Sequence, residues 1–377
     1  MSDSTVQGTN PSPGAPPATA PAKPSLTDKP LYISSSPHIG SPVSSGKLMR
    51  RVIIALAPVT IFGIVLYGFP ALLTIVVSIV TAVVSESLFR KITNKEPRHR
   101  DCSAVVTGLL LALILPPGTP LWITAMGALF AVVVAKEFFG GLGANVFNPA
   151  LIGRAFILLS FPVAATTWAV PRAFFAADAV SAATAADAVS SATPLGIIKM
   201  GGSVADVGID LASKGLAAGS DYCSTIWSFF LGIRGGCIGE SSIVLILIGF
   251  VYLLLTKTID WRTPVSMIFS VLFFSLVFGG DPLFAIVAGG VLFGAVFMAT
   301  DYVTSPLTAS GKLIFGFCAG LITVLIRQWG NYPEGVTYSI LIMNAVTPYL
   351  NRLLQKKYGY VKPQKPAKAA ADKGGTK

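Results

Sequence analysis

Two short stretches rich in alanine, serine and threonine follow one another near the middle of the chain. The first is Asp178-Ala-Val-Ser-Ala-Ala-Thr184, and the second, at an offset of nine residues, runs from Asp187 to Thr193 and continues into Pro194-Leu195. Such small side chains cannot build a core, but a threonine hydroxyl can form an ester with a phosphate group. On composition alone, a flexible connector is an equally good interpretation of this region.

The second stretch resembles the flavin-attachment motif Asp-x-x-(Ser/Thr)-(Gly/Ser)-Ala-Thr of the RnfD/NqrB family. This family comprises membrane subunits of the Rnf and sodium-pumping quinone reductase complexes. In it, a separate flavin transferase joins the last threonine of the motif to the phosphate of FMN through a phosphoester. The resemblance therefore implies covalent FMN at Thr193. The other motif positions are Asp187, Ser190, Ser191 and Ala192.

Individual motif positions differ in how well they match. Ser191 stands where the family more often has glycine, which is a small departure. Asp187 is expected to act in recognition by the transferase or in organising the local turn, not in redox chemistry. The upstream Thr184 is the poorer candidate, because Ala182 replaces the glycine or serine of the motif and no Pro-Leu pair follows.

Six further segments between residues 32 and 358 also look like this family. They are Ser36-Pro-His-Ile39, residues 107–117, residues 139–150, Gly279-Gly-Asp-Pro-Leu283, residues 297–306 and Tyr332-Pro-Glu-Gly-Val336. The chain shows no long structured extension before Ser36, which favours the Rnf member over the quinone reductase member.

The resemblance implies a membrane subunit of a redox-driven ion pump of the ferredoxin:NAD oxidoreductase type, with FMN as an electron relay. The expected partners are the other subunits of a membrane electron transport complex, the flavin transferase, and a sodium ion or proton. Whether a second, non-covalent flavin binds is left open. Two other function classes also stay open, a passive channel or transporter without a redox role and a structural anchor without a cofactor.

Carboxylates near apolar segments are candidates for ion handling, because an ionisable group inside a membrane is costly and usually functional. Glu86, Glu137, Asp281 and Asp301 fit this description. For each of them a helix cap or a salt-bridge partner is the simpler interpretation.

A metal centre built by this chain alone is not expected. The cysteines are Cys102, Cys223, Cys237 and Cys318, without a C-x-x-C pair, and the histidines are His38 and His99. Zinc and iron–sulfur sites need a denser set of such ligands.

The composition places these residues in a membrane protein. Hydrophobic residues make up 53% of the chain, charged residues only 12%, and the mean hydropathy is +0.70, whereas soluble domains carry about 25% charged residues. We expect an all-α polytopic membrane protein with roughly ten transmembrane segments. They are residues 52–67, 71–89, 104–115, 121–135, 150–163, 241–256, 265–278, 283–300, 313–326 and 336–350.

Several of these segments are shorter than the ~20 residues that a perpendicular span needs, so some are expected to be broken or half-helices. The best half-helix candidate is 104–115, which Pro116-Pro117-Gly118 ends.

Lysine and arginine set the expected orientation, because they favour cytoplasmic loops next to the spans. They cluster before the first segment and after the second, sixth and tenth, which all fall on one side if ten segments cross. Arg327 after the ninth segment is an exception. We therefore expect a bacterial inner-membrane protein with both termini in the cytoplasm and the central loop on the external, periplasmic side.

Five regions follow from these patterns. Residues 1–45 form a disordered cytoplasmic tail, 46–163 a first membrane half, 164–240 an external loop with the flavin site, 241–355 a second membrane half and 356–377 a basic cytoplasmic tail. The net charge of +11 lies in tails and loops flanking apolar segments, so nucleic-acid binding is not expected.

Overall fold

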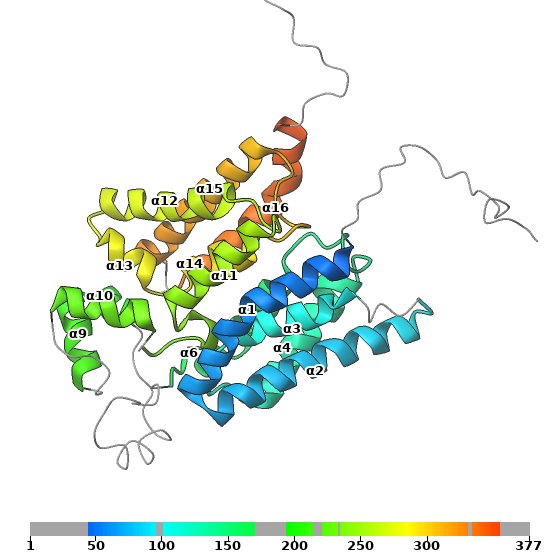
Figure 1. The fold of residues 1–377 in the computed structure, drawn as a ribbon, viewed down its shortest axis with the longest axis horizontal. Helices are drawn as coiled ribbons and strands as arrows, with labels where there is room; N and C mark the ends of the chain where they lie inside the picture. The colour runs from blue at the N-terminus through cyan, green and yellow to red at the C-terminus, as the bar shows by residue number, and fades with distance from the viewer. Residues whose placement is uncertain are drawn as a thin grey trace, which may run out of the picture. The chain divides into compact units, whose positions relative to one another are not determined.

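Helices make up the regular structure in every part of the chain that the computed structural model describes (Figure 1). These parts are residues 44–95, 101–169, 194–213, 221–232, 234–330 and 334–354. Within them there is no strand. The expectation of an all-α polytopic protein is thus confirmed.

We group the helices by the two expected apolar halves and the expected loop between them, although the helix Pro162–Thr166 crosses the expected boundary between residues 163 and 164. The first half holds α1 (Ser45–Tyr67), α2 (Phe69–Ile92), α3 (Ser103–Leu113), α4 (Leu121–Val132), a π-helical turn (Val133–Glu137), α5 (Pro149–Ser160) and α6 (Pro162–Thr166). The loop holds α8 (Pro194–Lys199), α9 (Val204–Ser213), α10 (Tyr222–Leu231) and a 3-10 turn (Ile238–Glu240). The second half holds α11 (Ile243–Leu255), α12 (Arg262–Val277), α13 (Pro282–Val287), α14 (Val291–Phe293), a π-helical turn (Gly294–Met298), α15 (Ala309–Trp329) and α16 (Val336–Leu354).

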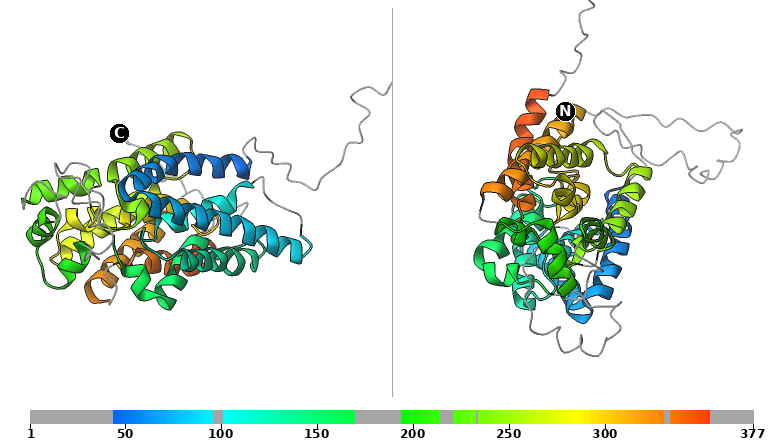
Figure 2. Two further views of the ribbon diagram at one scale, coloured as in Figure 1. Left: turned by 90° about the horizontal axis from the view of Figure 1, so that it is seen from below. Right: turned by 90° about the vertical axis from the view of Figure 1, so that its left-hand side faces the viewer.

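Local sequence explains the first pair of helices, α1 and α2. Ser44 caps α1 by accepting a hydrogen bond from the N–H of Lys47 at 3.4 Å. Gly68 has a φ of 72°, which suits glycine, and Pro70 occupies the first turn of α2, where its missing N–H costs nothing. The chain therefore reverses at Gly68, where the two helices meet before they diverge (Figures 1 and 2).

Three of the described helices, α1, α2 and α15, are long and apolar enough to cross a membrane. Their outward faces are also apolar, since Ile61 is 61% exposed and Val84 is 57% exposed. Exposed apolar faces of this extent suit a hydrocarbon environment, in which a helix satisfies all its backbone hydrogen bonds internally.

Shorter helices fill the other expected segments. α3 is buried along almost its whole length and ends just before Pro116, which agrees with a half-helix. The segment expected at 283–300 is a broken helix, because α13 ends at Val287 and α14 begins only at Val291. The break contains Gly289, whose φ of 73° explains why glycine is found there.

Helices α12 and α15 pack closely through small residues. A Cβ added at Gly316 would lie 2.5 Å from the backbone oxygen of Thr263, and one at Gly320 would lie 2.7 Å from that of Met267. The hydroxyl of Ser270 donates to the backbone oxygen of Phe317 at 2.6 Å. Close approach of this kind is how small residues hold membrane helices together.

The helices of the expected loop share a small hydrophobic core with α13. Its buried residues are Val207 and Leu211 of α9, Phe229 of α10, and Phe284 and Ala288 at α13. The rings of Phe229 and Phe284 meet edge to face, with centroids 5.5 Å apart. The loop helices are therefore fixed on α13, the first part of the broken helix.

Candidate functional site

The expected attachment residues lie just outside the described part of the chain. Thr193, Asp187, Ser190, Ser191 and Ala192 all belong to the range 170–193. The same holds for Thr184. The described chain resumes at Pro194, the first residue of α8, so α8 marks where the residue after Thr193 enters the fold.

A pocket of about 200 Å³ lies between α8, α12, α13 and α15. Its lining includes Leu195, Ile198, Lys199, Phe278, Phe284 and Arg327. Lys199 also donates a hydrogen bond to the backbone oxygen of Gly330, beyond the end of α15. Burial lowers the pKa of Lys199 below its ordinary value.

Arg327 of α15 holds the end of α13 in place. Its Nη1 donates to the backbone oxygen of Ala285 at 2.6 Å, and its Nη2 donates to that of Ala288 at 3.1 Å. The last carbonyls of a helix have no partner within the helix, so these bonds satisfy groups that would otherwise be orphaned. The third donor, Nε of Arg327, is buried and has no hydrogen-bond partner among the described residues.

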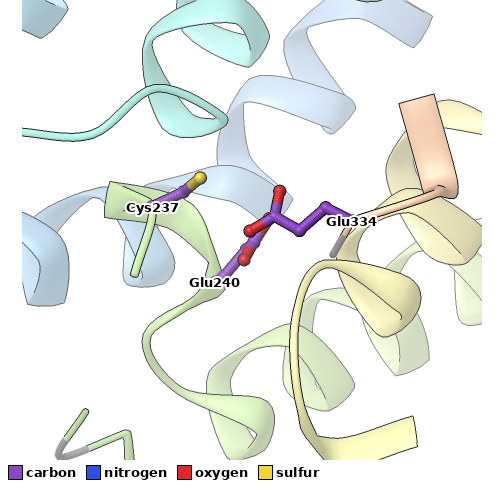
Figure 3. Close-up of side chains that lie close together, drawn as sticks. All are labelled: Cys237, Glu240 and Glu334. Carbon is purple, nitrogen blue, oxygen red and sulfur yellow. The ribbon is translucent and has the colours of Figure 1, made fainter. Parts of the chain in front are cut away.

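A second charged cluster lies deeper in the helical bundle, around Arg154 of α5. Its guanidinium forms ion pairs with Glu334 and, at 3.8 Å, with Glu240, and its Nη2 lies 3.6 Å from the sulfur of Cys237. Cys237 and Glu240 come from the turn before α11, and Glu334 from the segment before α16. Figure 3 shows these three side chains pointing toward one another.

The three side chains form a geometrically possible metal site, since their ligand atoms lie within 4.8 Å of one another. The guanidinium of Arg154, however, contacts all three and already supplies a positive charge to this cluster. A metal ion would have to displace or repel it. We therefore assign Cys237, Glu240 and Glu334 to an ion-pair network.

The helix break links the pocket to this network. A Cβ added at Gly289 would lie 2.7 Å from Leu195 and 2.9 Å from Arg327, whereas one at Gly290 would collide with the carboxylate of Glu240. Arg234 adds a further link, because it donates to the backbone oxygens of Val287 at 2.5 Å and Glu240 at 2.7 Å. The segment that follows Thr193 and the buried network thus meet at two adjacent glycines.

Two of the candidate carboxylates, Glu86 and Glu137, form buried ion pairs between α2 and the π-helical turn Val133–Glu137. Glu86 accepts from Nζ of Lys136 at 2.7 Å, and Glu137 lies 3.4 Å from Nε of Arg90. Lys136 and Glu137 belong to the π-helical turn, a feature often found at functional sites.

The other two candidate carboxylates have local partners. Asp281 caps α13 by accepting from the N–H of Phe284 at 3.0 Å, and it also accepts from the hydroxyl of Tyr222. Desolvation by burial, together with this bond to Asp281, raises the pKa of Tyr222 to about 12. Asp301 accepts from the hydroxyl of Thr304 at 3.1 Å. The four carboxylates therefore do not converge on one site.

A chamber lined by Lys136, Asn148 and Asp301 encloses about 70 Å³ between the two apolar halves. That is room for a few water molecules and too little for a flavin ring. The sequence left open whether a second, non-covalent flavin binds, and this chamber offers no space for one.

Sequence reasoning missed the arginines of both sites. Arg154 lies within an expected span and Arg327 was an exception to the charge rule, so both were visible as charges in an apolar setting. Considering the basic residues together with the carboxylates would have identified them.

Comparison with known proteins gives consistent matches over most of the chain. A sequence model described as the NQR2, RnfD, RnfE family matches residues 32–359. The D-type subunit of a proton-translocating ferredoxin:NAD(+) oxidoreductase complex from Clostridium ljungdahlii is 44% identical over 330 residues, covering 86% of this chain and 94% of that protein. Its counterpart in a Na(+)-translocating ferredoxin:NAD(+) oxidoreductase complex from Acetobacterium woodii is 41% identical over 345 residues, covering 90% and 98%. The corresponding protein of an ion-translocating oxidoreductase complex from Stutzerimonas stutzeri is 36% identical over 355 residues, covering 87% and 96%.

Proposed function

The chain belongs to the NQR2, RnfD, RnfE family, and from this premise we propose that it is the D-type membrane subunit of an ion-translocating ferredoxin:NAD oxidoreductase complex. The resemblance inferred from its motifs is confirmed. The observation that carries the proposal is the similarity to such subunits over nearly the whole length of both chains. Under this proposal the complete activity belongs to the complex, and its other subunits are the partners of this chain.

Within this role we propose that a flavin transferase esterifies FMN to Thr193 and that the flavin serves as an electron relay. The supporting observations are the motif and the pocket beside α8, which offers apolar walls and the buried donor of Arg327. Bound there, the flavin supplies the electron transfer, while the protein fixes its position and environment. A covalent tether keeps the local concentration of such a relay high.

The proposed coupling of electron transfer to ion transport needs only a small difference in reduction potential. Moving one charge against 100 mV costs about 2.3 kcal/mol, and two electrons yield about 1.4 kcal/mol per 30 mV. A potential drop of roughly 50 mV per electron pair would therefore suffice for one ion. The ion is either a proton or sodium, and the names of the two relatives differ on this point.

We also propose the orientation that the lysine and arginine pattern favours, with both termini in the cytoplasm and α8 to α10 on the external side of a bacterial inner membrane. Electrons from a cytoplasmic donor would then cross the membrane to reach Thr193. The break at Gly289 and Gly290 lies between α8 and the buried network.

Co-expression with a flavin transferase tests the proposal directly. The chain is expected to give a flavin fluorescence band on a denaturing gel, and Thr193→Val is expected to abolish it. Thr184→Val is the matched control, because it removes the same hydroxyl from the poorer copy of the motif and should leave the band intact. A passive channel or a structural anchor predicts no band in any variant.

A further inference from the structure

The pocket beside α8 lies within reach of the proposed attachment site. Leu195, which lines it, is two residues from Thr193, and two residues span at most about 7 Å. Its apolar walls include Phe278 after α12, Phe284 of α13 and Ile198 of α8. The rest of the lining includes the polar or charged residues Lys199, Ser275, Asp281, Arg327 and Gln328. A flat ring system attached to Thr193 by a flexible chain would find its nearest apolar cavity here.

The unpaired donor of Arg327 is unusual for such a site. A buried donor without an acceptor is destabilising and rare in native proteins. Both Nη atoms of Arg327 are bound to carbonyl oxygens of the α13 end, so the guanidinium is held in place. Its Nε–H is therefore a fixed, unused donor in a residue that lines the pocket.

The other charged residues of the pocket already have partners. Lys199 donates to the backbone oxygen of Gly330, and Asp281 accepts from Phe284 and Tyr222. Neither residue supplies the pocket with a donor that is as firmly positioned as Nε–H of Arg327.

We propose that this pocket binds the isoalloxazine ring of the flavin tethered at Thr193 and that Nε–H of Arg327 donates a hydrogen bond to the ring's pyrimidine edge. The ring has two apolar faces, which suit Phe278, Phe284 and Ile198, and one edge of carbonyl oxygens and nitrogens that accept hydrogen bonds. The inference rests on the proposed function and deepens it, because it assigns residues for the non-covalent part of the binding.

Arg327 would then tune the flavin as a positioned charge. A charge-assisted hydrogen bond is stronger when the acceptor carries negative charge, as the ring edge does after reduction. Arg327 itself is neither oxidised nor deprotonated in this role. Its effect is to favour the reduced ring and so to raise the reduction potential.

The test uses three variants of the full chain, purified after co-expression with the transferase. Arg327→Gln removes the charge and the Nε donor. Ile198→Trp fills the pocket from the half-buried face of α8 without touching Arg327. Arg262→Gln removes an arginine of α12 whose side chain is 38% exposed and pairs with Asp260, and it serves as the matched control.

Three readouts are compared: the flavin band on a denaturing gel, the fluorescence anisotropy of the flavin in the native protein, and its midpoint potential. We expect all variants to keep the band. Arg327→Gln should weaken the preference for the reduced ring about tenfold, which lowers a two-electron potential by about 30 mV. Ile198→Trp should lower the anisotropy, because a displaced ring moves freely. Arg262→Gln should match the wild type.

The outcomes separate the two proposals. A wild-type chain without a flavin band overturns the proposed function, and the docking site with it. A wild-type band with an anisotropy or potential that neither Arg327→Gln nor Ile198→Trp changes overturns the docking site alone. If Arg327→Gln fails to fold, Ile198→Trp still decides, because its anisotropy must fall if the ring occupies this pocket.

Discussion

Leu195 and Arg327 lie against the same glycine, Gly289, at the break between α13 and α14. A Cβ there would approach the side chain of Leu195 to 2.7 Å and that of Arg327 to 2.9 Å. The segment that follows the proposed flavin site is thus in direct contact with the broken helix. One residue further, Gly290 lies against Glu240 of the buried ion-pair network.

Gly289→Ala should therefore disturb the break. The substitution places a side chain at a φ of 73° and against two neighbours, and a strained residue of this kind costs about 1–3 kcal/mol. We expect a lower free energy of unfolding in mixed detergent micelles. Gly118→Ala is the control, because no atom lies within 4 Å of its added Cβ. Equal stability of the two variants would contradict the assigned role of Gly289.

The network around Arg154 makes a separate prediction. Arg154→Ala removes the ion-pair partner of buried Glu240 and half-buried Glu334, and breaking a buried pair costs about 3–5 kcal/mol. Arg262→Ala breaks a partly exposed pair with Asp260 and should cost about 1 kcal/mol or less. Chemical unfolding of both variants measures the difference. Similar losses would show that the Arg154 network is not the buried ion-pair cluster described above.

The orientation can be tested with an existing cysteine. Cys223 of α10 is exposed, whereas Cys237 is buried. A membrane-impermeant maleimide should label Cys223 from the periplasmic face of spheroplasts and not from the outside of inverted vesicles. Cys223→Ser identifies the labelled position by loss of signal. Labelling of Cys223 only in inverted vesicles would reverse the proposed topology.

Much of the fold can be predicted from the sequence, because long apolar runs predict membrane helices directly. All ten expected segments contain helices, and α3 ends at Leu113, shortly before the prolines that predicted its end. The break at Gly289 was harder to locate, because glycine pairs in apolar segments usually serve helix packing, as Gly316 and Gly320 do here. The break is seen only in the structure, from the end of α13 at Val287, the start of α14 at Val291 and the φ of 73° at Gly289.

The charged network could not be predicted in detail, because its members are far apart in the sequence. Arg154 and Glu334 are separated by 180 residues, and their pairing depends on how the two apolar halves pack. The loop helices were also missed, since α8 to α10 are short and small-residue regions resemble connectors. The motif at Thr193, in contrast, was recognised from the sequence by its resemblance to a family motif, although it lies outside the described residues.

The most direct test of the central claim is mass spectrometry of the chain after co-expression with the flavin transferase, first intact and then digested. The account predicts an intact mass raised by FMN less one water, with the addition on the peptide that contains Thr193. Thr193→Val should return the mass to that of the bare chain, whereas Thr184→Val should keep the addition. An unmodified wild-type chain, or a modification that survives Thr193→Val, would contradict it.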